Sequence, residues 1–364
     1  MILITTQCFP PDRGGIEILM GGLADAIHGG GEAVAVYADR AHTDVADPAP
    51  YTVKRFGGFK PLRRRLKAYA VACAVRAQNV KGVFADSWKS VERLPPLSVP
   101  IAVLAHGMEF PAAPSASKRA RIARALAKAN TVIANSAYTA SLVRPYLSDG
   151  DRRLRVVNPP IGLQAEPDET ALKQVRDIIA GRGPVLLTLA RLEPRKGVDM
   201  VIRALPDILK SHPNVIYLVA GSGDDDRARL GQIAAAAGVA GSVGFIGPVG
   251  GKVKAALFAS TDVFVMPTRR EGDSVEGFGI AFLEAGWYGV PALAGRDGGA
   301  LDAVRDGQTG LLCDATDQAD VLRQAQRLLS DSELKRRLGA AASERARGAA
   351  QWNAALTQYL DALR

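Results

Sequence analysis

The first 37 residues, MILITTQCFPPDRGGIEILMGGLADAIHGGGEAVAVY, contain one complete strand–helix–strand unit. The apolar run Ile2–Thr6 predicts a strand, and the glycine-containing segment Phe9–Gly15 predicts a loop. A helix is then expected over Ile16–His28 and a second strand over Ala33–Tyr37. Strands joined by a helix are typical of parallel sheets, so this unit predicts an α/β protein.

The alternation of strands and helices continues and restarts near the middle of the chain. Strands are predicted in the first half at Gly82–Ala85, Ile101–Ala105 and Thr131–Ala134, and in the second half at Val185–Ala190, Val215–Ala220, Val243–Ile246, Val263–Met266, Pro291–Ala294 and Gly310–Cys313. Arg155–Leu163 contains two adjacent prolines and predicts an interdomain linker. We expect two doubly wound, Rossmann-like domains, 1–163 and 164–346, facing each other across a cleft, with a C-terminal helix at about 347–364 returning to the first.

The composition suits a folded protein of two domains. The chain has 364 residues, of which 48% are hydrophobic and 23% charged. The start of the chain has no signal-peptide features, and no run of about 20 apolar residues predicts a membrane span. Cys8, Cys73 and Cys313 lie far apart in the sequence, which predicts reduced thiols in a cytoplasmic protein.

Basic residues are concentrated in the first half of the chain. Residues 1–165 contain 22 Lys or Arg and 12 Asp or Glu, a net charge of +10, which leaves −1 for the rest of a chain whose total is +9. The cations gather in two runs, one at Arg63, Arg64, Arg65 and Lys67 and one over Lys118–Lys128. Such runs are commonly solvated, but near an anionic membrane each cation adds about 1 kcal/mol. Few aromatics are interleaved, so nucleic acid fits poorly and we expect peripheral contact with the cytoplasmic face of a membrane.

Two loops after predicted strands are candidates for binding phosphate. Gly14 and Gly15 open the first helix, where the backbone can approach an anion closely, although a double glycine is as often only a tight turn. No Gly-x-Gly-x-x-Gly is present there, so a nicotinamide cofactor is not expected. In the second half, Arg191-Leu-Glu-Pro-Arg195-Lys196-Gly197 places cations at a strand-to-helix turn. This turn is either solvated surface or a pyrophosphate site that stabilises a departing nucleotide.

Two glutamates lie eight positions apart in Glu276-Gly-Phe-Gly-Ile-Ala-Phe-Leu-Glu284. If a helix starts near Gly279, Glu276 lies on the loop before it and Glu284 within it, and carboxylates there can accept hydrogen bonds from sugar and ribose hydroxyls. Asp224-Asp225-Asp226 contains the pattern Asp-x-Asp of some metal sites, but its place at a helix start favours a role with the helix dipole. No other cluster has metal-ligand spacing, so neither a metal nor another cofactor is expected.

Three motifs of the second half resemble those of the retaining glycosyltransferases of family four, which have the GT-B fold. They are Arg191-x4-Lys196-Gly, Glu276-Gly-Phe-Gly-x4-Glu284-Ala and Gly298-Gly299-x2-Asp302-x-Val304-x2-Gly307-x2-Gly310-x-Leu312. The resemblance extends into the first half through Pro10-Pro11-x2-Gly14-Gly15-Ile16 and Ala105-His106-Gly107-x-Glu109. The linker sequence Asn158-Pro-Pro-Ile-Gly departs from the family's common Asn-Gly-Val-Asp. The stretch from Met266 to Gly277 is similar to the phosphatidylinositol mannoside mannosyltransferases, which implies GDP-mannose as the donor.

The resemblance implies a role for each matched residue. The donor-binding residues would be Gly14, Gly15, Arg191, Lys196, Glu276, Gly277, Phe278, Gly279, Ile280 and Glu284. Among them Arg191 and Lys196 would bind the diphosphate and support its departure. Glu276 would hold the transferred sugar, and Glu284 would hold the ribose. His106 would position sugar and acceptor, because front-face displacement with retention lets the departing phosphate take the acceptor's proton.

Other interpretations remain open from the sequence. They are a UDP-sugar-dependent transferase of lipopolysaccharide or polysaccharide synthesis, a sugar-nucleotide epimerase of a related fold, and a non-catalytic nucleotide-binding protein. The complete set of donor-site residues favours a transferase over the epimerase and the non-catalytic protein. The similarity of the stretch from Met266 to Gly277 implies an α-mannosyltransferase, and we expect a lipid-linked or glycan acceptor.

Overall fold

The computed structural model describes residues 1–12, 14–41, 49–148 and 152–364. Arg13, beside the Gly14-Gly15 pair, lies outside them. The chain divides into two compact units, one made of Met1–Gly162 with Ala350–Arg364 and the other of Leu163–Ala349. The expected junction was between residues 163 and 164, and the C-terminal segment joins the first unit from Ala350 rather than from about 347.

The first unit is built on a seven-stranded parallel sheet with the order β3-β2-β1-β4-β5-β6-β7. Its strands are β1 (Ile2–Thr6), β2 (Val34–Asp39), β3 (Thr52–Phe56), β4 (Gly82–Ala85), β5 (Ile101–Ala105), β6 (Thr131–Ala134) and β7 (Leu154–Val156). Its helices are α1 (Gly15–Gly29), α2 (Lys60–Ala77), α3 (Trp88–Val91), α4 (Ala116–Leu126), α5 (Ala137–Val143) and α14 (Trp352–Leu360).

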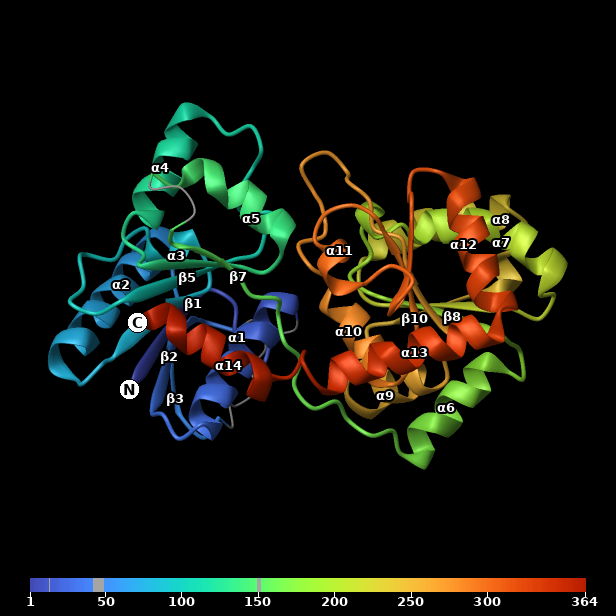
Figure 1. Ribbon diagram of the computed structural model, residues 1–364, viewed down its shortest axis with the longest axis horizontal. Coiled ribbons are helices and arrows are strands. Elements are labelled where there is room, and N and C mark those ends of the chain that lie inside the picture. Colours follow the sequence, from blue (N-terminus) through green and yellow to red (C-terminus); the bar gives the residue numbers. More distant parts are fainter. Residues whose placement is uncertain (13, 42–48, 149–151) are drawn as a thin grey trace. The chain divides into compact units, whose positions relative to one another are not determined.

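Alternating residues of these strands pack into two cores, one on each face of the sheet. Leu3 packs with α2, α3 and α4, whereas Ile2 and Ile4 pack with α1 and α14. The returning helix α14 lies beside α1 (Figure 1), and its Tyr359, 1% exposed, packs edge-on against Phe84 of β4. The expected return of the C-terminal helix to the first domain is therefore confirmed.

The second unit contains a six-stranded parallel sheet with the order β10-β9-β8-β11-β12-β13. Its strands are β8 (Val185–Leu189), β9 (Ile216–Ala220), β10 (Val243–Gly247), β11 (Val263–Met266), β12 (Ala292–Gly295) and β13 (Gly310–Cys313). Its helices are α6 (Glu169–Ile179), α7 (Val198–Ser211), α8 (Asp224–Ala236), α9 (Gly251–Ala259), α10 (Ile280–Trp287), α11 (Ala300–Ala303), α12 (Gln318–Ser330) and α13 (Ser332–Arg347). Buried side chains of α7, α8 and α12 share one core, and α10 packs along α13 (Figure 1). Both sheets thus have the doubly wound Rossmann order.

Two strands were not predicted. β3 is an edge strand whose residues are exposed or half-buried, so it lacks the apolar pattern of the other strands. β7 has only three residues, and two of them, Arg155 and Val156, fall in the segment expected to be the linker. The C-terminal helix was expected from about residue 347, but α13 ends at Arg347 and α14 begins at Trp352. None of the helices within the described ranges has the length and hydropathy needed to cross a membrane.

Candidate active site

The strand order of the second unit reverses between β8 and β11, which pair at the centre of its sheet. In open α/β sheets, ligands bind beyond the carboxyl ends of the strands at this reversal. The loop after β8 contains the cationic turn Arg191–Gly197, and the loop after β11, residues 267–279, contains Glu276. The fold therefore brings together two motifs whose Lys196 and Glu276 are 80 residues apart in sequence.

Arg195 and Lys196 belong to a short 3-10 turn, Pro194–Lys196, between β8 and α7. Gly197 follows with φ +71°, and a Cβ at this residue would lie 2.0 Å from the carbonyl oxygen of Pro267. Only glycine fits this contact, so the turn after β8 packs directly on the loop after β11. Both cationic side chains are largely buried, with 7% and 10% of their surfaces exposed.

Glu276 is the common partner of these two cations. Its Oε2 accepts hydrogen bonds from Nη1 of Arg195, at 2.9 Å, and from Nζ of Lys196. Burial alone would raise the pKa of Glu276, but the charges and hydrogen bonds of Lys196 and Arg195 outweigh it and lower the pKa to about 2. Glu276 is therefore an ionised carboxylate held between two cations.

Arg191 lies apart from this cluster. Its side chain is 69% exposed, and its Nε lies 2.8 Å from Oε1 of Glu193. Nε of Arg195 donates to the other oxygen of the same carboxylate at 2.7 Å. The structure thus places Arg195, and not Arg191, beside Lys196 and Glu276. Contact of Arg191 with a diphosphate stays a prediction. Arg195 was part of the predicted cationic turn, but the sequence interpretation gave it no role of its own.

Helix α10 begins at Ile280, after Gly279 at φ +92° as its N-cap, close to the predicted start. Phe278 is 2% exposed, so its ring is part of the core and only its backbone can reach a ligand. The carbonyl of Glu276 accepts a hydrogen bond from N–H of Gly299 at 2.8 Å, which fixes the loop before the helix. Donor contacts of Gly277, Phe278, Gly279 and Ile280 stay predictions.

Glu284 lies within α10 and is 6% exposed. Its Oε1 accepts a hydrogen bond from Nζ of Lys254, on α9, at 2.7 Å. A buried carboxylate needs such a partner because an unpaired buried charge is strongly unfavourable. Lys254 is a second residue missed from the sequence, since nothing in its local pattern indicates the helix it faces.

Arg269 is the third missed residue. Its Nη1 and Nη2 donate to the two carboxylate oxygens of Asp199, on α7, at 3.0 and 3.1 Å, and its Nε lies 2.6 Å from Glu271. Its backbone N–H donates to the carbonyl of Arg195 at 2.9 Å. Arg269 therefore connects the loop that contains Glu276 to the turn that contains Lys196.

His106 follows β5 in the first unit. Its Nε2 lies 2.9 Å from the carbonyl oxygen of Asp86, and its backbone N–H donates to Oε1 of Glu109 at 2.7 Å. Oδ2 of Asp86 accepts from the backbone N–H of Gln7, which follows β1. His106 therefore lies in a hydrogen-bonded network at the carboxyl ends of these strands, and its role with sugar and acceptor stays a prediction.

Gly14 is the N-cap of α1, and Gly15 is its first residue, exposed to solvent. A Cβ at Gly14 would lie 2.2 Å from Oε2 of Glu17, so the Glu17 carboxylate lies over this glycine. Like charges repel, so an approaching phosphate requires this carboxylate to move aside. The predicted phosphate contact of Gly14 and Gly15 is not tested by this geometry.

The first basic run is only partly a surface feature. Lys67 is 3% exposed and its Nζ lies 2.6 Å from Oδ1 of Asp39, while Arg63 pairs with Oδ2 of the same carboxylate at 3.0 Å. Arg64 donates to the side chain of Gln7 at 3.0 Å. The prediction that all four cations face a membrane was wrong for Lys67, because a carboxylate on β2 holds it inside the unit. Arg65 is exposed.

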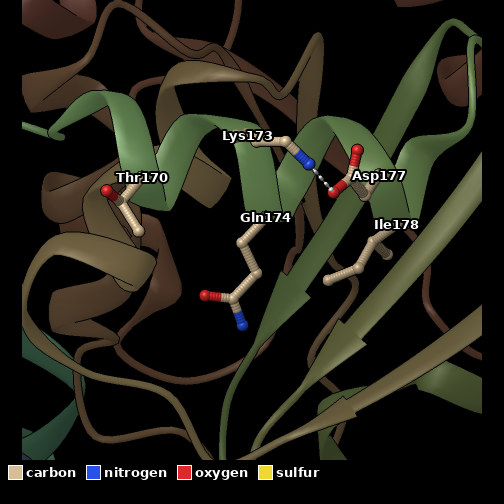
Figure 2. A pocket seen from close by; sticks show the side chains of 5 residues that line it. All are labelled: Thr170, Lys173, Gln174, Asp177 and Ile178. Atoms are coloured by element: carbon tan, nitrogen blue, oxygen red, sulfur yellow. Dashed lines mark hydrogen bonds and ion pairs between the residues drawn. The ribbon is translucent and has the colours of Figure 1, made fainter.

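A shallow depression on α6 contains none of the predicted residues (Figure 2). It is lined by Thr170, Lys173, Gln174, Asp177 and Ile178. The lysine pairs with Asp177 at 2.7 Å along the exposed helix face, so the depression lacks the converging cations of the site above. It is a shallow surface feature of α6 and not part of the candidate site.

The aspartates expected to serve the helix dipole do open a helix. Asp224, Asp225 and Asp226 form the first turn of α8, and Asp226 accepts a hydrogen bond from Arg229 at 2.6 Å. Within the described ranges, no group of three or more His, Cys, Asp or Glu side chains is arranged to hold a metal ion. Independence of a metal stays a prediction.

Comparison with known proteins places this arrangement in a family. The model of the glycosyl transferases group 1 matches residues 173–345. The chain is 31% identical, over its whole length and 98% of the other chain, to the GDP-mannose-dependent alpha-(1-6)-phosphatidylinositol monomannoside mannosyltransferase of Mycobacterium tuberculosis. Among solved structures, sucrose-phosphate synthase from Thermosynechococcus elongatus superposes with a TM-score of 0.80 at 20% identity, covering 99% of this chain and 97% of that one. HepE from Anabaena, solved with UDP and glucose, gives 0.78 at 19% identity, covering 100% and 99%. The two Rossmann-like units are those of the GT-B fold, and the chain belongs to the group 1 glycosyl transferases and is a hexosyltransferase.

Proposed function

We propose that this glycosyltransferase moves an α-mannosyl residue from GDP-mannose to a lipid-linked or glycan acceptor, with retention of configuration. The observation that carries the proposal is the cluster of Lys196, Arg195 and Glu276 at the strand reversal of the second unit. Mannose as the sugar is supported by the name of the mycobacterial relative and by the similarity of the stretch from Met266 to Gly277.

Lys196 and Arg195 would act on the leaving group. The bond between the anomeric carbon and the diphosphate breaks, the acceptor hydroxyl oxygen forms the new bond on the same face, and its proton passes to the departing phosphate oxygen. Negative charge grows on the diphosphate during this step, and two mostly buried cations stabilise it more strongly than solvated ones. His106 would position the sugar and the acceptor, and no metal or other cofactor takes part.

A panel of nucleotide sugars tests the donor. Hydrolysis or transfer should be measured with GDP-mannose, GDP-glucose, UDP-glucose and UDP-galactose under the same conditions. GDP-mannose should give the highest kcat/KM, by about tenfold or more over the others. A preference for a UDP-sugar would replace the mannosyl proposal with the UDP-dependent alternative.

We further propose that the enzyme works at an anionic membrane surface through helix α2. Its exposed apolar side chains are spaced three or four residues apart, so they lie on one helical face. They are Phe59 (76% exposed, directly before the helix), Leu62 (54%), Leu66 (50%) and Tyr69 (68%). The helix contains Lys and Arg but no Asp or Glu, and Arg65 is exposed beside these side chains. An apolar face flanked by cations suits the interface of an anionic bilayer.

Sedimentation with vesicles tests the membrane contact. The native chain should bind vesicles containing about 30% phosphatidylglycerol and bind zwitterionic vesicles weakly. Replacing Leu62, Leu66 and Arg65 by Ser should abolish binding. Leu163→Ser is the matched control, because Leu163 is an 85% exposed leucine outside α2. Equal binding by both variants would contradict the proposed surface.

A further inference from the structure

The cations proposed to hold the diphosphate already have an anionic partner within the chain. Lys196 and Arg195 both donate to one oxygen of Glu276, and Nε of Arg195 is taken by Glu193. Glu276 is 12% exposed and is kept ionised by these cations. Its other oxygen, Oε1, has no hydrogen-bond partner among the residues that the structure describes.

Building on the proposed donor site, we infer that Glu276 is an internal counter-anion that the diphosphate of the donor displaces from Lys196. A diphosphate on Lys196 would bring negative charge next to the ionised Glu276 in a mostly buried place, where water screens poorly. The carboxylate and the diphosphate therefore compete for the same ammonium. Rotation about the side-chain bonds of Glu276 lets the carboxylate turn away, while its backbone stays held by the hydrogen bond from Gly299.

Displacement frees the Glu276 carboxylate to bind the donor sugar. Both oxygens of Glu276 then accept hydrogen bonds from hydroxyls of the donor sugar, which follows the diphosphate into the site. Oε2, the oxygen that Lys196 and Arg195 occupy, thus becomes available to a sugar hydroxyl only after the diphosphate has reached Lys196. Diphosphate binding and sugar binding are coupled through one residue, so a free monosaccharide should bind more weakly in the absence of GDP than in its presence.

The charges of the cluster predict that removing the Glu276 carboxylate strengthens diphosphate binding. Arg191, Arg195 and Lys196 contribute three positive charges, and Glu193 and Glu276 two negative charges, so these five side chains together have a net charge of +1. Glu276→Gln keeps the size of the side chain, raises the balance to +2, and removes the competitor. Tighter binding of a diphosphate is expected, although transfer is lost.

Calorimetric titration with GDP tests the displacement. Glu276→Gln should bind GDP at least tenfold more tightly than the native chain, a difference of about 1.4 kcal/mol. Glu333→Gln is the matched control, because it removes one negative charge from a side chain that is 69% exposed on α13 and should leave GDP affinity unchanged. Glu276→Asp, which shortens the reach of the carboxylate, should give a smaller gain and serves if the glutamine variant does not fold.

The double variant Lys196→Ala, Glu276→Gln shows whether the gain in GDP affinity depends on Lys196. Lys196→Ala should weaken GDP binding more than tenfold, and the gain from Glu276→Gln should fall to threefold or less when Lys196 is already Ala. An equal gain in both backgrounds, or no gain from Glu276→Gln, would overturn the inference while leaving the donor site intact. If Lys196→Ala binds GDP like the native chain, the donor-site assignment under the proposed function itself falls.

Discussion

Arg269 offers the sharpest test of how the candidate site is held together. It binds both carboxylate oxygens of Asp199 at 3.0 and 3.1 Å, and only 12% and 9% of these two side chains are exposed. Arg269→Met keeps much of the apolar stem and removes the guanidinium. The Asp199 carboxylate is then left buried without its cation.

The expected loss of stability follows from this geometry. Removing one partner of a buried ion pair costs about 3–5 kcal/mol, because the remaining charge is uncompensated. Arg269→Lys retains the charge but loses the paired, planar contact, so it should cost less, about 1–2 kcal/mol. Replacing both partners, in Asp199→Leu with Arg269→Met, should recover most of the loss. Donor KM should rise in both single Arg269 variants, because the side-chain pair with Asp199 anchors the residue whose backbone N–H holds the carbonyl of Arg195.

Urea unfolding measured by tryptophan fluorescence checks these values. Trp88 and Trp352 belong to the first unit and Trp287 to the second, so a Trp88→Phe, Trp352→Phe background reports the second unit alone. A loss of less than about 1 kcal/mol in the unfolding free energy of Arg269→Met would contradict the buried ion pair. So would a double variant whose loss equals the sum of the losses from Asp199→Leu and Arg269→Met measured singly.

Three further predictions follow from individual contacts. Glu276 has a folded-state pKa of about 2 against an ordinary 4.5, so its contribution to stability is present above pH 4.5 and lost as the pH falls towards 2. The unfolding free energy of Glu276→Gln, measured in urea between pH 2 and 6, should therefore depend less on pH than that of the native chain. Gly197→Ala should lower the free energy of unfolding by about 2 kcal/mol more than Gly238→Ala, as measured by thermal unfolding. Both residues have positive φ (+71° and +69°), but only a Cβ at Gly197 would meet a neighbouring carbonyl, at 2.0 Å. Lys67→Met should destabilise the first unit by about 3 kcal/mol in urea unfolding, since it leaves the buried Asp39 with one cation fewer.

The sequence predicted the strands and turns of the second unit well because each of them is marked by a short pattern of neighbouring residues. A buried parallel strand is a short apolar run, and the expected strand Val263–Met266 agrees with β11 at both ends. Glycine with positive φ marks a turn, and Gly279 indicated the start of α10 within one residue. Edge strand β3 escaped prediction because its exposed residues carry no apolar pattern.

Side-chain partners were harder to predict than elements. Lys67 looked like surface within a basic run, but its partner Asp39 is 28 residues away and only the pairing of α2 with the sheet brings them together. Arg191 and Arg195 belong to the same motif, and the 3-10 turn at Pro194–Lys196 decides which of them faces Glu276. Such choices depend on the direction of one turn, which residue types alone do not determine.

Lys254 illustrates the same limit and provides a last test. Glu284 is proposed to accept hydrogen bonds from the donor's ribose, and Lys254 holds one of its oxygens at 2.7 Å from a different helix. If Lys254 orients the carboxylate, Lys254→Met should raise the donor KM about tenfold with little change in kcat, because the ribose is bound and does not react.

Ribose recognition separates this orienting role from a structural one. The native enzyme should prefer GDP over 2′-deoxy-GDP about tenfold in competition binding, since a hydrogen bond to a charged group is worth about 1.5–3 kcal/mol. Glu284→Gln and Lys254→Met should both lose most of that preference. Lys252→Met is the control, because Lys252 lies on the same helix, pairs with Asp168 instead, and is 63% exposed. A Lys254→Met variant that keeps the full preference for the 2′-hydroxyl while losing stability would show that the lysine only neutralises a buried charge.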